Sequence, residues 1–416
     1  MNELLVESCA VLCSTFSAIL GERLKLHGQI RKRKKRRYWV RKWILKRSSE
    51  VQNLVDHELR SNHHEDFKNL LRMSEEQFDY LLERVTKHIL KSDTNMRQAL
   101  SPKIKLQVTL RYLATGDSFK SLEYLFRVPK NTISKFIPET CKAIIKELEE
   151  FIKVPSTEDE WKNVEYNFRE RWNFPGCAGS LDGKHVIIRA PSHSGSAFYN
   201  YKNSFSIVLL AVADANYNFL YLDVGAKGRG SDGGIFQNSS LHAALETNCL
   251  NMPRDFVIVG DDAFPLKTYL MKPYSRRNMT QEERIYNYRL SRARRVIENT
   301  FGILVSKFRI FEKPISLKIE SVDDVVLACC SLHNWLRKTN PTYVSSGLID
   351  YEDENHRIIR GSWRETPTAS LQDLPRNNSR NPQQQAQQIR DKYRDYFNNE
   401  GAVPWQYRLV NATTTE

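Results

Sequence analysis

The chain has 416 residues, of which 40% are hydrophobic and 11% aromatic, so it can bury the cores of two or three domains and is not a disordered protein. Its seven cysteines form no CxxC pair and no regular framework. This excludes a disulfide scaffold and a Cys/His zinc cluster and is typical of a reducing compartment. The apolar start of the chain is too short and too broken to span a membrane, so we expect a soluble intracellular protein without membrane contact.

The net charge of +14 is concentrated near the N-terminus. Residues 31–47 (RKRKKRRYWVRKWILKR) hold eleven of the 63 Lys and Arg residues and no acid, which leaves 52 bases against 49 acids elsewhere. A run this dense is typical of nuclear import or of phosphate contact, whereas the alternative is a solvated tail without a specific partner. We interpret residues 1–48 as a basic arm and expect a nuclear location, with the cytoplasm as a second compartment. Its expected DNA-contacting residues are Arg31, Lys32, Arg33, Lys34, Lys35, Arg36 and Arg37.

Residues 49–155 have the three- and four-residue apolar spacing of helices. Within them, a helix over 119–126 is followed by a three-residue turn and a second helix that opens near Asn131, a good N-cap residue. Two short helices joined by a turn of three to four residues, with the second opening at Asn131 or Thr132, form a helix-turn-helix pattern. The start of the second helix is the end that reaches bases in the major groove, so we expect Lys130, Asn131 and Lys135 to contact DNA. The alternative is a plain helical bundle.

From about residue 176 the apolar period changes to the two-residue period of strands. GCAGSLDGKHVIIRAP predicts one strand, SFSIVLLAVADANYNFLYLDVGAKG a hairpin and DFVIVGDDAF a fourth strand, and residues 281–311 return to helix. This order predicts an α/β domain over 160–337 whose site forms at the strand ends. After Arg337 the chain is polar and NPQQQAQQ is typical of a linker. We therefore expect residues 338–416 to be a polar tail with one short helix around 387–397.

Acidic residues fall at the edges of these apolar elements. Asp182 lies within the first strand, Asp232 lies in the glycine-rich loop GRGSDGGIF, and Asp261 and Asp262 end the fourth strand. Glu298 borders the buried face of the helix that follows. Mg²⁺ prefers hard oxygen ligands, and two such ions can clamp the attacking and leaving oxygens of a phosphodiester. The pattern therefore predicts a carboxylate metal site.

Each acid also has a purely structural interpretation. Glu298 could pair with Arg294 or Arg295 on its own helix. The acid pair after the fourth strand could cap the following turn, and Asp182 could belong to a turn with the next glycine. The sequence alone leaves these alternatives open.

Neighbouring polar residues are assigned from strand and helix geometry. Lys184 shares the face of Asp182 and is a candidate phosphate contact, whereas His185 points the opposite way and is expected to pack or hydrogen-bond. The Cys329-Cys330 pair and His333 lie in an apolar helical stretch, so we expect a packed core there and no protease dyad.

Several long motifs, in the order in which they occur, resemble those of the PIF/Harbinger transposases and their domesticated nuclease relatives. That family belongs to the DDE superfamily, which has an RNase H-like catalytic fold. The motifs are WNFPGCAGSLDGKHVIIRAP, SGSAFYNYKNSFSIVLLAVADANYNFLYLDVGAKGRGSDGGIFQNS, VIVGDDAFPLKTYLMKPY and ERIYNYRLSRARRVIENTFGILVSKFRIF with CCSLHNWLR. The resemblance covers most of residues 36–337. It implies an α/β, RNase H-like DDE catalytic domain preceded by an α-helical, helix-turn-helix-like domain.

The resemblance assigns the catalytic carboxylates to Asp182 in LDGKH, Asp261 in VGDDAF and Glu298 in RRVIENTFG, with Asp232 in GSDGGIF as a further metal ligand. Asp262 is the alternative to Asp261, and the choice between them stays open. The implied activity is that of a Harbinger-type, metal-dependent DNA endonuclease with a two-metal site for Mg²⁺ or Mn²⁺, and with strand transfer in a full transposase. A separate Myb/SANT-like protein partner is also implied.

Two other functions stay open. The fold could survive as a domesticated, catalytically silent DNA-binding or scaffold protein, although no acidic ligand of the family is missing. The chain could also cleave RNA or hybrids with the same metal chemistry, because a basic arm does not distinguish DNA from RNA. The DNA target, the oligomeric state (a homo-oligomer is one option) and the choice between a mobile element and a host protein are not determined by the sequence.

Overall fold

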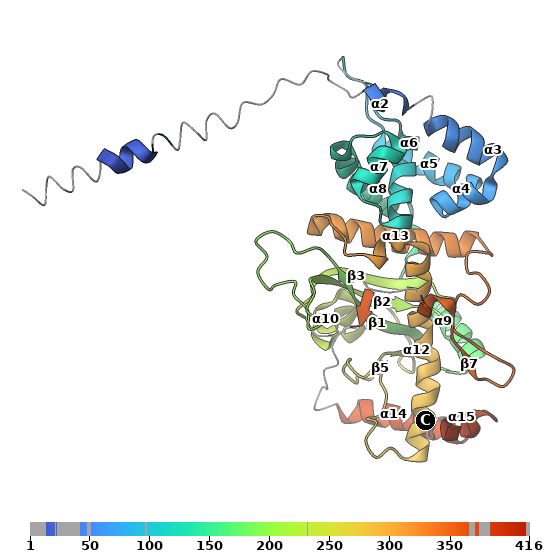
Figure 1. Ribbon diagram of the computed structural model, residues 1–416. Helices are drawn as coiled ribbons and strands as arrows, with labels where there is room; N and C mark the ends of the chain where they lie inside the picture. The colour runs from blue at the N-terminus through green and yellow to red at the C-terminus, as the bar shows by residue number, and fades with distance from the viewer. Residues whose placement is uncertain are drawn as a thin grey trace, which may run out of the picture. The chain divides into compact units, whose positions relative to one another are not determined.

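A six-stranded mixed β-sheet organises the structure (Figure 1). Its main path has the order β3-β2-β1-β4-β5. The central strand β1 (Cys177–Ile187) is antiparallel to β2 (Ser206–Ala213), which is antiparallel to β3 (Phe219–Lys227). On its other side β1 is parallel to β4 (Val257–Val259), and β4 is parallel to β5 (Leu270–Met271). The predicted strand, hairpin and fourth strand are therefore present, although β4 is shorter than expected.

Both faces of the sheet are buried, which explains why its strands read as nearly continuous apolar runs. In β2, alternate side chains enter two different hydrophobic clusters, Leu209 and Ala211 on one face and Leu210 and Val212 on the other. The first face is covered by the long helix α12 (Gln281–Lys307). The other cluster includes side chains of α10 (Asp232–Asn238) and α11 (Ser240–Glu246).

Helix α13 (Ile319–Thr339) joins the sheet to the helical region before it. It packs on β3 and on α8, and Figure 1 shows it lying between the sheet and the N-terminal helices of this unit. Its His333 Nε2 contacts the carbonyl of Tyr217 at 2.7 Å, and Asn334 bonds both the N–H and the C=O of Phe219. Cys329 is also fully buried, so the expected packed core is confirmed.

The helical region has the predicted pair of helices, α7 (Phe119–Phe126) and α8 (Lys130–Glu147). The expected N-cap was wrong, because α8 begins one residue before Asn131 and Pro129 occupies the cap position. Lys130, Asn131 and Lys135 are exposed. Their contact with DNA stays a prediction. The remaining elements here are a π-helical turn (Leu54–Leu59), α3 (Arg60–Asn62), α4 (His64–Leu71), α5 (Glu75–Ile89), α6 (Pro102–Thr115), a 3-10 turn (Glu149–Phe151) and α9 (Glu158–Trp172).

Residues 338–416 differ from the expected polar tail. We call them the C-terminal segment. Its α14 matches the short helix expected near 387–397. The other elements were not expected, and β8 adds to the main sheet by pairing with β1. The segment contains β6 (Tyr351–Glu352), β7 (Ile358–Ile359), a 3-10 turn (Ser362–Glu365), β8 (Leu371–Asp373), α14 (Gln384–Asn398) and α15 (Gln406–Ala412).

The C-terminal segment folds back because α12 carries buried arginines that need partners. Arg292 forms two bonds of 2.8 Å to the carboxylate of Glu352 in β6, and Arg295 contacts the same carboxylate at 3.0 Å. The two arginine side chains are only 4% and 6% exposed. A buried charge without a partner is strongly destabilising, so these pairs hold the segment against α12.

The computed structural model describes residues 14–20, 22, 42–47, 51–95, 98–230, 232–365, 371–373 and 383–412. The chain divides into a unit of Met1–Lys46, with α2 (Lys42–Leu45), and a unit of Arg47–Glu416. The seven bases predicted to contact DNA in the basic arm lie outside the described residues. Among the described residues, no helix is long and apolar enough to cross a bilayer.

Replacing Glu352 with glutamine tests this anchoring. Glu352→Gln leaves two buried guanidinium groups without a carboxylate and is expected to lower the free energy of unfolding by about 3–5 kcal/mol, measured by urea denaturation. The exposed neighbour Glu354 provides the matched control, since Glu354→Gln is expected to change stability by less than about 0.5 kcal/mol. Equal effects of the two substitutions would show that the buried pairs do not hold the segment.

Candidate active site

The parallel register of β1 and β4 brings two of the predicted aspartates to the same place. Ser180 pairs with Val259, so Asp182 and Asp261 each follow two residues further along their strands. Both line a cleft of about 1440 Å³, which we call the main cleft. Asp182 is only 6% exposed there. The sheet therefore holds two carboxylates at one edge of a solvent-accessible space.

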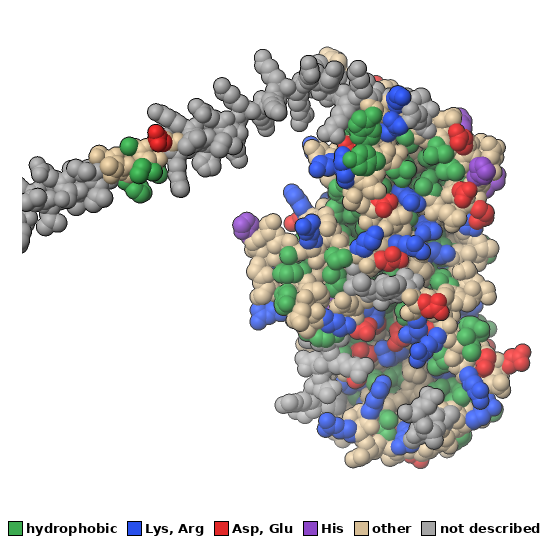
Figure 2. Space-filling view, in the orientation of Figure 1, with side chains coloured by type: hydrophobic (Ala, Val, Ile, Leu, Met, Phe, Trp, Pro, Cys, Tyr) green, Lys and Arg blue, Asp and Glu red, His purple; other side chains and the backbone are tan. Residues whose placement is uncertain are grey.

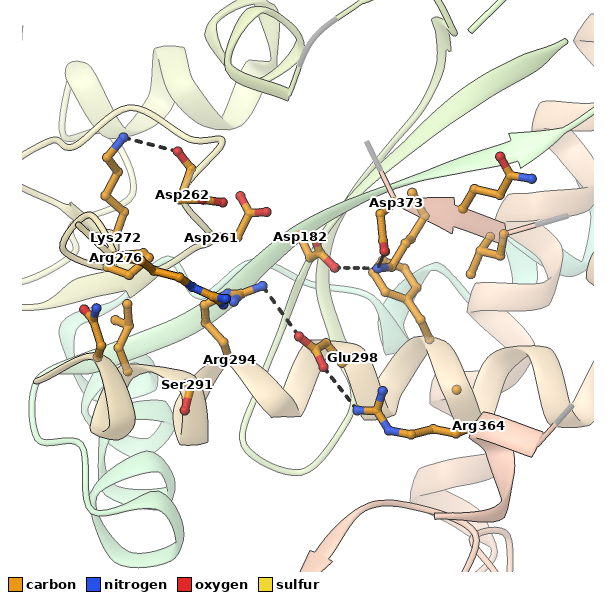
Figure 3. Close-up of a pocket in the computed structure, with 18 of the residues that line it drawn as sticks. Asp182, Asp261, Asp262, Lys272, Arg276, Ser291, Arg294, Glu298, Arg364 and Asp373 are labelled. Carbon is orange, nitrogen blue, oxygen red and sulfur yellow. Dashed lines mark hydrogen bonds and ion pairs between the residues drawn. The ribbon is translucent and has the colours of Figure 1, made fainter. Parts of the chain in front are cut away.

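Helix α12 supplies the third carboxylate. The Ser180 hydroxyl bonds the carbonyl of Arg294 at 3.4 Å, which fixes this turn of α12 against β1. One turn later Glu298 enters the main cleft. Figure 3 shows Asp182, Asp261 and Glu298 around the same opening, with Glu298 on the helix. The structure therefore gathers the three residues predicted to be catalytic in one cleft.

Asp182 has an internal cation as its neighbour. Its Oδ2 lies 3.0 Å from Lys184 Nζ, and its Oδ1 accepts a 2.9 Å bond from the backbone of Gly183. Lys184 also pairs with Asp373 of β8. Burial alone would lower the pKa of Lys184, but the charges of the two aspartates outweigh it and raise that pKa. The prediction that the side chains of Asp182 and Lys184 lie on the same face of β1 is confirmed.

Asp261 is a carboxylate of the main cleft whose pKa is raised. Burial, followed by the charge of Asp182, raises the pKa of Asp261 to about 6, although Arg294 and the 2.9 Å bond from Ala263 N–H oppose the shift. The bond from Ala263 is the turn cap that the structural interpretation expected. A bound cation would lower the free energy cost of keeping these close, buried carboxylates ionised.

Glu298 is turned toward two arginines. Its Oε1 lies 3.6 Å from Arg294 Nη2, and its Oε2 lies 3.3 Å from Arg364 Nη2 (Figure 3). The pair with Arg294, one turn earlier on α12, is thus formed as in the structural interpretation. Within the described part of the chain, no group of three or more Asp, Glu, His or Cys side chains is close enough to hold a metal ion. The carboxylates share a cleft without forming an assembled ligand set.

The other sequence-derived residues are placed less completely. Asp262 lines the main cleft beside Asp261, so the choice between them stays open. Asp232 begins α10, and its side chain lies outside the described part of the structure. His185 is fully buried, with Nδ1 2.9 Å from the Ser206 hydroxyl, and burial lowers its pKa to about 4. Its expected packing role is confirmed.

The donors of the main cleft suit a divalent cation such as Mg²⁺ or Mn²⁺. They are carboxylate oxygens, and burial together with the charge of Asp182 disfavours the ionised form of Asp261, which a bound cation would favour. Asp182 and Asp261 would hold the cation, joined by Glu298 if its carboxylate turns away from the arginines.

Basic residues surround these acids. Figure 2 shows Lys, Arg, Asp and Glu side chains intermixed on the face that lies over the region between the sheet and α14. Such a lining attracts a polyanion while its centre stays acidic. The bases of the main cleft are Lys184, Lys202, Lys272, Arg276, Arg277, Arg294, Arg364 and Arg390.

Comparison with known families agrees with this arrangement. Residues 181–334 match the family model described as "DDE superfamily endonuclease". The matched range contains Asp182, Asp261 and Glu298. The chain carries a DDE superfamily endonuclease domain. We refer to it below as the DDE domain.

Full-length relatives extend the match beyond the DDE domain. Human "Putative nuclease HARBI1" is 28% identical over 261 residues, which cover 62% of this chain and 74% of that protein. "Protein ALP1-like" of Arabidopsis thaliana is 24% identical over 310 residues, which cover 70% and 75%. The chain is homologous to these proteins. No solved structure gives a significant match.

Sequence reasoning missed the residues that enter the main cleft from the C-terminal segment. From outside the matched range, Arg364 contacts Glu298 itself, and Asp373 contacts Lys184, the partner of Asp182. The available signal was the run LIDYEDENHRIIRGSW, whose aromatic and β-branched residues indicate folded structure within a polar region.

Replacing Asp261 with asparagine is expected to stabilise the metal-free protein. Since its pKa rises from 3.8 to about 6 on folding, the ionised carboxylate destabilises the fold, and this penalty is absent below the lower pKa and complete above the higher one. Asp261→Asn should therefore raise the free energy of unfolding at pH 7 by on the order of 1–3 kcal/mol and change it little near pH 4. Urea denaturation in EDTA at both pH values measures this, and a loss of stability at pH 7 would contradict it.

Proposed function

We propose that this protein is a metal-dependent DNA endonuclease of Harbinger transposase type. The observation that carries the proposal is the convergence of Asp182, Asp261 and Glu298, all residues of the DDE domain, on one base-lined cleft. The strand order β3-β2-β1-β4-β5, with only β2 reversed along this path, supports an RNase H-like catalytic fold. Strand transfer by a freed 3′-hydroxyl at the same site belongs to the same proposal.

The proposed chemistry distributes roles among the residues of the main cleft. A bound Mg²⁺ or Mn²⁺ supplies an activated water and stabilises the leaving oxygen of the phosphodiester. Asp182 and Asp261 bind and orient the cation from two neighbouring strands, so their spacing is fixed by the sheet. Glu298 completes the donor set when it turns from Arg294 and Arg364. Lys184 stays beside Asp182 and limits the negative charge of the site.

The bases of the main cleft hold the DNA backbone near the carboxylates. Phosphate contacts supply most of the affinity of non-specific DNA binding, and they position the strand without reading sequence. In the same proposal the basic arm and the start of α8, with Lys130, Asn131 and Lys135, extend the DNA contact. A nuclear location and a Myb/SANT-like partner follow from the arm and from the family resemblance.

The ion pairs of Asp182 and Glu298 favour one alternative enough to test it. If Lys184, Arg294 and Arg364 stay paired with Asp182 and Glu298 when DNA binds, the protein binds DNA without cutting it and acts as a domesticated scaffold. If they are replaced by a divalent cation, the protein is a nuclease. Cleavage separates the two functions directly.

Plasmid nicking by the purified full-length chain tests the proposal. Wild type is expected to nick supercoiled plasmid with Mg²⁺ or Mn²⁺ and not with EDTA. Asp182→Asn and Glu298→Gln should each lower the rate at least about 100-fold, because each replaces an anionic carboxylate ligand of the cation with a neutral amide. DNA affinity should stay nearly unchanged in both variants.

The control for nicking is Asp159→Asn, which changes an exposed carboxylate on α9, outside the main cleft, and should leave the rate unchanged. Thermal unfolding of each variant shows whether it is folded. A folded, DNA-binding wild type that does not nick, alone or with nuclear extract, would favour the scaffold. Faster cleavage of RNA or hybrid duplexes than of DNA would instead indicate a ribonuclease.

A further inference from the structure

A second hollow continues the main cleft past Glu298. It has a volume of about 410 Å³ and lies between α12 and the β6–β7 part of the C-terminal segment. It shares Ser291, Arg294, Glu298 and Arg364 with the main cleft, so the two spaces are continuous. Beyond the shared residues it is lined by Arg295, Asp350, Ile358 and Arg360. Basic residues therefore extend across α12, away from the aspartates.

Arg364 is fixed in this hollow by a buried carboxylate. Its Nε lies 2.9 Å from each oxygen of Asp350, whose side chain is only 1% exposed. Asp350 is itself held by Asn299 of α12, through bonds of 3.0 Å to its backbone N–H and C=O. The Arg364 guanidinium also lies over the ring of Trp363, with 4.4 Å to the ring centre. An arginine held in this way loses little conformational entropy when it binds a further anion.

The arginines of the hollow have unused donors. Among the described residues, no acceptor contacts Arg364 Nη1, and the exposed Arg360 has no ion pair. Arg294 Nε is buried without an acceptor in the same set of residues. Guanidinium donors that line a hollow and have no acceptor of their own match the oxygens of a phosphate, which guanidinium groups bind through paired hydrogen bonds.

We propose that Arg360 and Arg364 bind phosphates of the DNA strand on the far side of Glu298 from Asp182. This inference rests on the proposed function and extends it, because it makes the C-terminal segment part of the substrate-binding surface. The contact has a second consequence at the carboxylates. A phosphate bound at Arg364 Nη1 shares the guanidinium charge that pairs with Glu298 and so weakens that pair, which couples DNA binding to release of Glu298 toward the metal site.

The test is the salt dependence of DNA affinity, measured with the full-length protein and a 30-base-pair duplex in EDTA, where nothing is cleaved. Each phosphate contact contributes about −0.9 to the slope of log K against log salt concentration. Arg360→Gln and Arg364→Gln should each make that slope less negative by about one and weaken binding severalfold at low salt. Arg357→Gln, an exposed arginine of the same segment that lines neither space, should leave the slope unchanged.

The variants also separate a binding role from a structural one. Arg364→Gln leaves the buried Asp350 without its cation and is expected to lower stability, so its folding is checked by urea denaturation. Arg360 is exposed, and Arg360→Gln decides the question if Arg364→Gln is unfolded. An unchanged slope in Arg360→Gln, with wild type binding duplex normally, would overturn the inference and leave the nuclease proposal standing. Failure of wild type to bind duplex DNA at all would overturn both.

Discussion

Compensation of buried charge on helix α12 determines how the rest of the chain is arranged. The helix lies under the sheet and carries arginines whose side chains are almost completely enclosed, and such groups are tolerated only with partners. Glu352 neutralises two of them from a position 57 and 60 residues later in the chain. Because this contact holds the C-terminal segment on α12, it also brings Arg364 and Asp373 to the carboxylates. The main cleft is thus built by two parts of the chain, of which only one belongs to the matched DDE domain.

The same electrostatics explain how a cluster of acids persists in a folded protein. Burial, and after it the charge of Asp182 on the neighbouring strand, raises the pKa of Asp261 and disfavours its ionised form. Lys184 and Arg364 reduce the remaining negative charge by pairing with Asp182 and Glu298. Each of these cations is in turn held by an aspartate. Lys184 pairs with Asp373 in β8, and Arg364 pairs with Asp350, the residue before β6. Internal ion pairs therefore compensate the carboxylates of the main cleft, and in the proposed function a divalent cation would replace part of this compensation.

The sequence predicts the parts of this structure that depend on local pattern. The two-residue period and the hairpin turn predict β1 to β3, and the apolar stripe predicts α12, so Asp182 and Glu298 could be proposed as neighbours. The fourth apolar strand adds Asp261 and Asp262, and the family motifs assign the first of the two. The C-terminal segment could not be predicted, because β6, β7 and β8 have only two or three residues each and show no period. Ion pairs between residues some 60 positions apart leave no local signal, which is why Arg364 was missed.

The central claim is that Asp182, Asp261 and Glu298 form a divalent-cation site. Calorimetric titration of Mn²⁺ into the DNA-free protein at pH 7 tests it most directly, since it needs neither cleavage nor a known DNA target. The account predicts saturable Mn²⁺ binding by wild type that is lost or at least about tenfold weaker in both Asp182→Asn and Glu298→Gln. Equal Mn²⁺ binding by wild type and both folded variants, or none by wild type, would contradict it.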